Sequence, residues 1–361
     1  MTTVPLTQNA MASPVIILIP VFNDWSAVSQ LLSLLDKAFG ESAKQGEYAV
    51  HAFLVDDGST EELGNSFDSV SSTALKSINI LALRRNIGHQ RAIAIGLSYI
   101  YETLPCEAVV VMDGDGEDRP EDVLALLDEY QRNHRKKIVF AERARRTERF
   151  TFKLFYKFYK ALHFMFTGRK VQVGNFSVLP FSLLKRLVVT SDLWNHYAAA
   201  SFKIRMPVAM LPLPRGYRLS GESRMNFVSL IVHGLSAMSV YGDSIGVRLL
   251  VGASIAISVV FVATTYVLIM RYGFGVALPD WAPVVAVGGA AMLLQMFTTI
   301  LIFVFIVLSG RDSASFLPLR DYKYFVERLI PIKGDVRFTL ERSKAEPATL
   351  IATTNGLDVA P

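Results

Sequence analysis

The sequence predicts an α/β fold, with a doubly wound, mostly parallel sheet followed by interfacial helices and a hairpin of two transmembrane helices. Two observations lead to this prediction. In the first part of the 361-residue chain, short apolar runs alternate with longer segments whose apolar residues recur with helical period. In the last third of the chain, two long segments contain no charged residue.

The short apolar runs are expected to be buried strands, because they are too short for helices and carry apolar residues on both faces. Each run leads into a polar loop, after which a helical stretch begins. The runs cover residues 15–20, 52–55, 78–83 and 109–112, and the helical stretches cover residues 25–39, 61–75, 90–101 and 121–133. Ligands of such open sheets bind beyond the carboxyl ends of the strands, so the loops mark one functional edge.

The fourth run ends in an acidic loop that carries Asp113, Asp115 and Glu117, with Gly114 and Gly116 between them. In an extended segment, side chains two residues apart point to the same side, so the two aspartates face one ligand. The glycines let the backbone turn and leave room for a bulky group. Hard oxygen ligands in this position suit Mg²⁺ or Mn²⁺ that is held jointly with substrate phosphates. The alternative is an acidic turn that caps the next helix.

The two charge-free segments, residues 249–270 and 281–310, are long enough to be transmembrane helices. A helix of about 20 residues crosses a hydrocarbon core of about 30 Å. A hydrophobic content of 51% and a mean hydropathy of +0.34 agree with a membrane protein, although a pair of buried core helices is the alternative. Cations before and after the pair place both ends in the cytoplasm and the hairpin tip outside. These cations are Lys203, Arg205, Arg215, Arg218, Arg224, Arg248, Arg311, Arg320, Lys323 and Arg328.

These features divide the chain into five parts. Residues 1–13 are expected to be a flexible N-terminus without a signal peptide, and residues 14–224 a catalytic domain. Residues 225–248 are expected to form juxtamembrane amphipathic helices, residues 249–310 the two transmembrane helices, and residues 311–361 a cytoplasmic tail.

The remaining composition bounds the partners of the chain. A single cysteine, Cys106, excludes an internal disulfide and fits a reducing compartment. The net charge of +5 is interpreted as attraction to anionic lipid headgroups of a bilayer rather than to nucleic acid, because no basic-aromatic nucleic-acid motif is present. A homo-oligomer is compatible with the sequence.

The order and spacing of the loop motifs resemble the family 2 glycosyltransferases of the GT-A fold, over roughly residues 14 to 240. The motifs are Ile19-Pro20-Val21-Phe22-Asn23, Val55-Asp56-Asp57-Gly58-Ser59-Thr60, Asn86-Ile87-Gly88 and Asp113-Gly114-Asp115. The resemblance implies a nucleotide-sugar donor, linked to UDP or GDP, and a divalent metal on its diphosphate. The implied metal ligands are Asp113, Asp115 and Glu117. The implied donor-binding residues are Pro20, Phe22, Asn23, Asp56, Asp57, Gly58, Asn86, Gly88, Asp113, Gly114 and Glu117.

Within this family, the sequence is most similar to the polyprenyl-phosphate group, which includes dolichyl-phosphate mannose synthase and undecaprenyl-phosphate glycosyltransferases. That group usually reads Asp-x-Asp-x-Gln-Asp-Pro-Pro, whereas Glu117 and Arg119 replace the Gln and the first Pro here. The segment from Arg218 resembles its Arg-x-x-Gly-Glu-Ser-Lys-Tyr motif, with Ser223 and Arg224 in the matching places. The resemblance implies a loop that closes on the donor and acceptor phosphates. A polar surface loop is the alternative.

A basic cluster at residues 142–149 follows another apolar strand and leads into an aromatic and basic stretch, residues 150–166. The stretch fits a helix at the membrane interface, with an ordinary buried helix as the alternative. Arg143, Arg146 and Arg149 are candidates for binding the acceptor phosphate, because guanidinium groups match phosphate oxygens bidentately. A solvated basic face is the alternative for each. The residues assigned to catalysis are Asp115, Arg218, Arg146 and Arg143.

One departure from the related sequences bears on the acceptor. Relatives often read Gly-Asp-Phe-Arg-Leu where this chain has Gly174-Asn175-Phe176-Ser177-Val178. Asn175 cannot act as a carboxylate base. A phosphate monoester needs little base catalysis, because its second pKa of about 6 leaves its oxygen anionic near neutral pH. A hydroxyl acceptor would need a base, for which the region of Asp192 and His196 is the remaining candidate. Asn175 therefore favours a lipid phosphate.

Together these features predict a membrane-anchored, inverting glycosyltransferase for cell-envelope glycan synthesis, with its catalytic domain and both termini in the cytoplasm. It would move one sugar from a nucleotide sugar to undecaprenyl or dolichyl phosphate at the inner or plasma membrane. One alternative is transfer to a hydroxyl of a lipid or glycan. Another is a catalytically silent membrane scaffold that keeps the fold to bind a partner.

Overall fold

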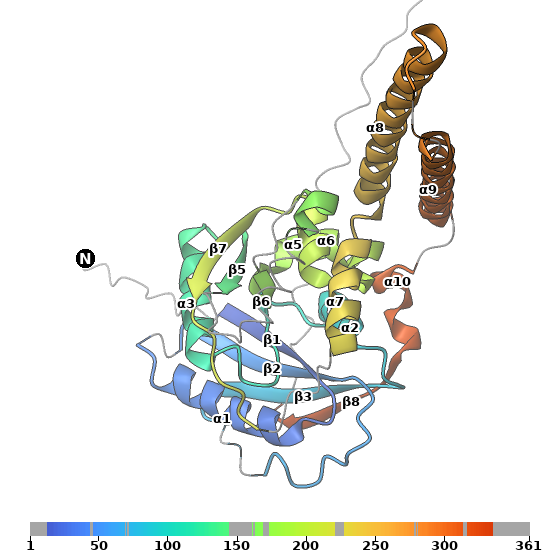
Figure 1. Cartoon of the computed structure of the whole chain (residues 1–361). Helices are drawn as coiled ribbons and strands as arrows, with labels where there is room; N and C mark the ends of the chain where they lie inside the picture. Colours follow the sequence, from blue (N-terminus) through green and yellow to red (C-terminus); the bar gives the residue numbers. More distant parts are fainter. Residues whose placement is uncertain are drawn as a thin grey trace, which may run out of the picture.

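A computed structural model of the chain describes residues 13–43, 46–68, 70, 72–143, 161, 163–168, 173–220, 227–277, 279, 281–312 and 316–334. Its centre is an eight-stranded sheet with the order β7-β5-β6-β4-β1-β2-β3-β8 (Figure 1). The strands are β1 (Ser13–Val21), β2 (Tyr48–Asp56), β3 (Leu75–Leu83), β4 (Ala108–Val111), β5 (Ile138–Arg143), β6 (Val173–Pro180), β7 (Val208–Leu213) and β8 (Val326–Lys333).

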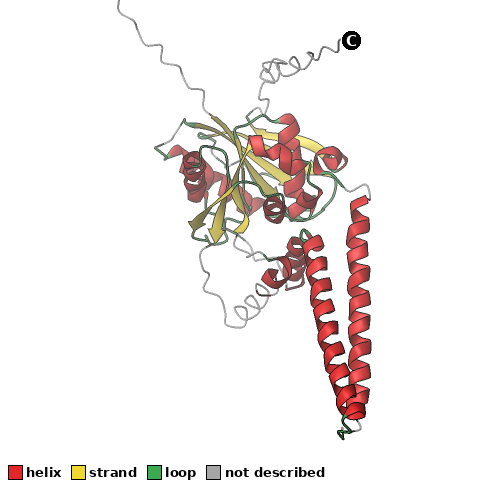
Figure 2. Cartoon of the chain, turned by 90° about the horizontal axis from the view of Figure 1, so that it is seen from above, coloured by secondary structure: helices red, strands yellow, loops and turns green. Residues whose placement is uncertain are grey.

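The middle of the sheet is parallel and is covered by helices on both faces. β1 pairs with β2 and β4, and β2 pairs with β3, all in parallel. Such strands are buried on both faces, which explains their continuous apolar runs. One face packs against α1 (Trp25–Gly40) and α3 (Pro120–Arg132). The other face packs against α2 (His89–Thr103), α5 (Phe181–Val188) and α6 (Tyr197–Lys203). This arrangement confirms the predicted doubly wound α/β sheet (Figure 2).

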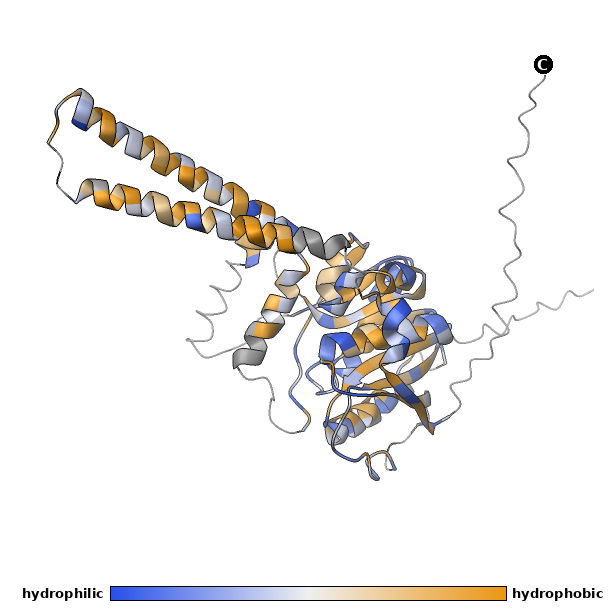
Figure 3. Cartoon of the chain, turned by 90° about the vertical axis from the view of Figure 1, so that its right-hand side faces the viewer, coloured by the Kyte–Doolittle hydropathy of each residue, from blue (hydrophilic) through white to orange (hydrophobic). Residues whose placement is uncertain are grey.

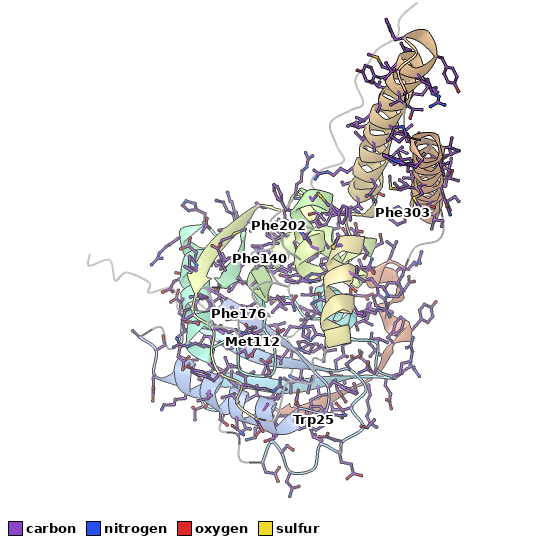
Figure 4. All side chains as sticks on the ribbon, viewed as in Figure 1. Trp25, Met112, Phe140, Phe176, Phe202 and Phe303 are labelled. Atoms are coloured by element: carbon purple, nitrogen blue, oxygen red, sulfur yellow. The ribbon has the colours of Figure 1, made fainter. Side chains whose placement is uncertain are left out.

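The two cores meet the sheet through different sets of side chains. Met112 and Phe176 belong to the core on the α1 face, with Trp25 near its outer end (Figure 4). Phe140 lies on the α2 face, where its ring stacks on Phe202 with the centroids 5.5 Å apart. Both cores extend to the strand ends that carry the polar loops, so those loops lie on closely packed apolar side chains.

Strand β6 reverses the direction of the sheet beside the acidic loop. It pairs antiparallel with β4 and with β5, whereas β7 runs parallel to β5. Val111, the last residue of β4, lies opposite Ser177. Because side chains alternate along a strand, this register brings Asn175 to the same face as Asp113. The departure noted at Asn175 therefore lies next to the acidic loop.

The C-terminal part of the chain returns to the sheet. Strand β8 pairs antiparallel with β3, with Ile80 opposite Ile330. Just before it, the Tyr322 side chain is buried and its hydroxyl donates to Glu102, 2.5 Å away on α2. Residues 311–361 were expected to be a tail, whereas residues 326–333 form this strand of the sheet. Its apolar pattern is broken by charged residues and a proline, so periodicity alone does not indicate a strand there.

Two long apolar helices leave the domain as a hairpin, as the sequence predicted (Figure 3). They are α8 (Gly242–Leu268), which continues as a π-helical turn to Gly273, and α9 (Ala282–Asp312). Their candidate membrane segments have mean hydropathies of 2.3 and 2.2, and few of their residues are buried within the protein. At about 1.5 Å per residue, each helix is long enough to cross a hydrocarbon core of about 30 Å.

The hairpin is joined to the domain through α7 (Phe227–Ser239) and the first turn of α8. Val240, Tyr241 and Ile245 pack on Ala199 of α6, and the Tyr241 hydroxyl donates to the Ala199 carbonyl at 3.2 Å. Arg248 donates to the Met165 carbonyl at 3.1 Å. The base of α8 is thus packed against the domain that contains the sheet.

Candidate active site

The acidic loop after β4 is shaped by its own carboxylates. Asp118 Oδ2 accepts the Asp113 backbone N–H at 2.9 Å, and Asp115 Oδ1 accepts the Glu117 N–H at 3.0 Å. Gly116 has a φ of +83°, and a Cβ there would lie 2.4 Å from Leu219 Cγ. Only glycine fits this turn, both for its backbone conformation and for the close approach of the Leu219 side chain.

Each predicted metal-binding carboxylate meets a positively charged or titratable partner. Asp113 Oδ1 lies 3.1 Å from His89 Nε2, and Asp115 Oδ2 lies 3.4 Å from Arg218 Nη1. Glu117 forms an ion pair with Arg215. The concentrated negative charge of the loop is therefore balanced from several sides. Burial acts to lower the pKa of His89, but the carboxylates of Asp113, Asp57 and Asp115 together outweigh burial, and the pKa is raised.

Arg218 reaches the loop from a strap, residues 214–220, that follows β7. The strap lies along the loop, with the Gly216 N–H donating to the Glu117 carbonyl at 2.8 Å and the Leu219 N–H donating to the Asp115 carbonyl at 2.9 Å. The Arg218 guanidinium also contacts Asp24, with Nη2 3.0 Å from Oδ2. The structure thus brings together Arg218 and Asp115, which the sequence analysis had both assigned to catalysis.

The carboxylate oxygens of this loop fit a divalent cation whose coordination is completed mainly by phosphates of a bound substrate. Asp113 and Asp115 supply hard carboxylate oxygens from one turn, as Mg²⁺ prefers when substrate phosphates complete its coordination. Among the described residues, no three His, Cys, Asp or Glu side chains are grouped closely enough to form a cation cage alone. The predicted set of Asp113, Asp115 and Glu117 is therefore not assembled as one cluster, and Glu117 is instead engaged by Arg215.

Asn23 joins the loops that follow β1 and β2. Its side-chain Oδ1 accepts the N–H groups of Thr60 at 2.8 Å and Glu61 at 3.0 Å, and its own N–H donates to Ser59 Oγ at 3.0 Å. Asn23 has a φ of 52°, a conformation that asparagine tolerates better than most residues. These bonds fix the turn in which Asp56 accepts the Ser59 N–H at 2.9 Å. A donor contact of Asn23 stays a prediction.

Asp57 holds the loop after β3 in place. It is 3% exposed, and its two oxygens accept the N–H groups of Ile87 at 2.8 Å and Gly88 at 2.9 Å. Burial raises the pKa of Asp57, although these amide bonds act in the opposite direction. Gly58 permits the same contact, because a Cβ there would lie 2.5 Å from the Asn86 nitrogen. The predicted contact of Asp57 with the nucleoside stays untested, and its contacts here are structural.

A hollow of about 430 Å³ lies beside Asp56 and Gly58. This volume falls in the usual range of about 300–1,000 Å³ for small-molecule sites. Its lining includes Arg84 of the loop after β3 and, from the C-terminal strand β8, Glu327 and Arg328. These β8 residues were not predicted from the sequence, because no local pattern indicates that a strand beyond the hairpin returns to this edge.

His89 and Gln90, at the start of α2, are further residues that the sequence analysis did not assign. Asn175 Nδ2 lies 3.0 Å from His89 Nε2, and Asn175 Oδ1 accepts a hydrogen bond from Gln90 Nε2 at 3.0 Å. The only local signal was their position directly after Gly88 in the third motif. The alternative base region is engaged elsewhere, because Asp192 pairs with Lys203 at 2.9 Å and His196 accepts the Ala199 N–H.

The other predicted residues fall into two groups. Pro20 lies near the end of β1 opposite Val55, Phe22 is 37% exposed just beyond it, and a Cβ at Gly114 would lie 3.1 Å from Val28 Cγ2. Arg143 ends β5, and nothing is described of its side chain. The remaining predicted acceptor residues lie outside the described part of the chain, namely Arg146, Arg149, Ser223 and Arg224.

Comparison with known proteins adds to this geometry. Residues 16–188 match the family described as glycosyl transferase family 2. An undecaprenyl-phosphate 4-deoxy-4-formamido-L-arabinose transferase of Klebsiella pneumoniae (strain 342) is 26% identical over 112 residues, covering 31% of this chain and 32% of the relative. The protein of that name from Pseudomonas fluorescens is 28% identical over 111 residues, covering 31% and 30%. The matched segment thus spans about a third of these curated relatives.

An uncharacterized glycosyltransferase of Bacillus subtilis is 26% identical over 132 residues, covering 36% of this chain and 37% of that protein. Among solved structures, glucosyl-3-phosphoglycerate synthase from Mycobacterium tuberculosis, in complex with Mn²⁺, UDP-glucose and phosphoglyceric acid, superposes with a TM-score of 0.44 at 15% identity. That superposition covers 65% of this chain and 80% of the other.

Proposed function

We propose that this chain moves one sugar from a nucleotide sugar to a polyprenyl phosphate. Residues 16–188 match glycosyl transferase family 2, and the chain is therefore a glycosyltransferase. The observation that carries the proposal is the acidic turn of Asp113 and Asp115, contacted by Arg218 and set at the strand ends of an α/β sheet. This is where open sheets of this class bind their ligands.

The donor is assigned to this edge by its chemistry. The hollow beside Asp56 and Gly58 would take the nucleoside, with β8 forming part of its wall. Asp113 and Asp115 would hold a divalent cation on the diphosphate. When bound, that cation would neutralise charge on the departing diphosphate. Arg218 would turn from carboxylate to phosphate oxygens, which accept the same planar guanidinium fork.

The acceptor is proposed to be a lipid phosphate. The Klebsiella and Pseudomonas relatives are named for transfer to undecaprenyl phosphate, and Asn175 supplies no carboxylate beside Asp113. In the proposed reaction, a phosphate oxygen of the acceptor attacks the anomeric carbon of the sugar from the face opposite the diphosphate. The bond to the diphosphate breaks, a nucleoside diphosphate leaves, and the anomeric configuration inverts. An acceptor that is already anionic needs orientation and charge stabilisation rather than proton removal.

The membrane arrangement follows from the hairpin. Helices α8 and α9 would cross the bilayer, with Arg248 near the start of α8 and Arg320 and Lys323 after α9 on the cytoplasmic side. Because the base of α8 packs on α6, the active site would lie close to the membrane surface, where both a soluble donor and a lipid headgroup can reach it. Both termini would then be cytoplasmic.

The test is a donor screen with purified full-length protein. UDP-sugars and GDP-sugars are offered with Mn²⁺ or Mg²⁺ and either undecaprenyl phosphate or undecaprenol, and lipid-linked sugar is measured. The proposal expects a product with the phosphate and little or none with the alcohol. A preference for the free alcohol would establish the hydroxyl-acceptor alternative. If no donor is turned over and the folded protein binds none of the nucleotides, the catalytically silent scaffold would be favoured.

A further inference from the structure

Five polar groups lie in a line of close contacts from α6 to the acidic loop. The Tyr197 backbone N–H donates to Gln90 Oε1 at 2.8 Å, and Gln90 Nε2 donates to Asn175 Oδ1 at 3.0 Å. Asn175 Nδ2 then lies 3.0 Å from His89 Nε2, which lies 3.1 Å from Asp113 Oδ1. Three elements of the fold, α6, α2 and β6, thus converge on one carboxylate.

The direction of the hydrogen bonds along this line is fixed by the backbone. A backbone N–H can only donate, so Gln90 must present its oxygen to Tyr197 and its amino group to Asn175. Asn175 must then accept with Oδ1 and present its amino group to His89. The usual ambiguity in orienting side-chain amides is removed here, because one end of the chain of bonds is a peptide group.

Burial makes these bonds costly to break. Gln90 is 8% exposed and Asn175 is 6% exposed, so water cannot readily replace a lost partner. An unsatisfied buried amide is unfavourable, and a fully connected polar network rigidifies the structure that surrounds it. The Gln90–Asn175 amide pair is therefore a stiff support for the imidazole that it contacts.

His89 Nε2 faces a donor on one side and an acceptor on the other. Its single N–H or lone pair can satisfy either Asp113 or Asn175 at one time, but not both. With its proton on Nε2 the ring donates to Asp113 and only contacts Asn175, whereas without that proton Nε2 accepts from Asn175 and only contacts Asp113. In both cases the Gly88 N–H bond to Asp57 fixes the backbone just before the ring. The position of the imidazole is thus determined by the surrounding protein.

We propose that His89, supported by the buried Gln90–Asn175 amide pair, is a positioning residue that orients the Asp113 carboxylate toward the cation and diphosphate of the donor. This inference rests on the proposed function, because it assumes that Asp113 is a cation ligand. It also gives Asn175 a role other than that of a missing base. The amide keeps an acceptor for Gln90 and adds a donor toward His89, whereas an aspartate would add a second negative charge near Asp113.

The test measures cation binding directly. Mn²⁺ is titrated into detergent-solubilised full-length protein with UDP or GDP, and free Mn²⁺ is followed by electron paramagnetic resonance. Loss of a group that orients a metal ligand typically costs about 10- to 100-fold in metal affinity. We therefore expect His89→Ala and Gln90→Leu to weaken Mn²⁺ binding by about tenfold or more. His89→Gln should recover most of the loss, because its amide can still donate to Asp113.

The matched control is Asn79→Ala, which removes another buried amide, one that donates to Ser77 at 3.1 Å within β3. This variant should bind Mn²⁺ as the wild type does. Unchanged Mn²⁺ binding in His89→Ala, or an equal loss in Asn79→Ala or His89→Gln, would overturn the positioning role while leaving the glycosyltransferase proposal intact. If the wild type binds no Mn²⁺ in the presence of either UDP or GDP, the proposed donor site is wrong and the inference fails with it.

Discussion

Arg218 offers the sharpest test of how the acidic loop works. Its guanidinium lies 3.4 Å from Asp115 and 3.0 Å from Asp24, and its side chain is only 20% exposed. If the same group stabilises phosphate charge during transfer, Arg218→Ala removes a charge-assisted hydrogen bond worth about 1.5–3 kcal/mol. If this bond forms in the transition state, its loss should lower the transfer rate by roughly ten- to a hundredfold. Arg218→Lys should fall between, because it keeps the charge but loses the planar fork.

The assay is transfer to undecaprenyl phosphate at saturating Mn²⁺, together with Mn²⁺ affinity in the absence of nucleotide. Removing Arg218 frees Asp115 from a competing cation, so Mn²⁺ should bind no more weakly than in the wild type. The control is Arg132→Ala, which removes an exposed arginine that pairs with Glu129 at 3.3 Å and should leave the rate unchanged. Full activity of Arg218→Ala would refute the reasoning, as would a loss that is wholly explained by weaker Mn²⁺ binding.

Asn175→Asp belongs to the same series, because it restores the acid that many relatives carry. A phosphate acceptor needs no base, so transfer to undecaprenyl phosphate should become no faster and should slow if the added charge repels the anion. A large gain in rate, especially with undecaprenol, would instead show that a protein base had been restored and that a hydroxyl is the natural nucleophile.

Three further outcomes are expected. Asp115→Ala in folded protein, and EDTA added to the wild type, should each abolish transfer, and metal-independent turnover at the wild-type rate would contradict the cation site. A cysteine at Phe274, which is 73% exposed at the hairpin tip, should react with an impermeant reagent outside intact cells, whereas a cysteine at Ser13 should not. Arg328→Ala should weaken UDP or GDP binding, whereas Lys323→Ala, a cation that pairs with Glu102 outside the hollow, should not; equal affinities would remove β8 from the donor site.

The sequence by itself determined the parts of this protein that depend on local pattern. Apolar runs of strand length and most stretches of helical period located the parallel core of the sheet, and charge-free length located α8 and α9. The stretch of residues 61–75, which was expected to be helical, was predicted wrongly, because its described residues form turns and β3 begins at Leu75. The motif around Asp113 predicted the functional edge, because polar loops that directly follow parallel buried strands lie together at one edge of the sheet. These features are encoded within windows of one or two dozen residues.

Only the tertiary structure decided which of those residues meet. The contact of Arg218 with Asp24 joins positions 194 residues apart, and no periodicity reports such a pair. The predicted contact of Asp57 with the nucleoside stays untested, but only the structure shows that the Ile87–Gly88 turn brings two backbone N–H groups to its oxygens. The addition of β8 to the edge of β3, and the line from Tyr197 to His89, likewise depend on packing between distant segments. Packing selects these contacts because buried polar groups must find partners wherever the fold brings them together.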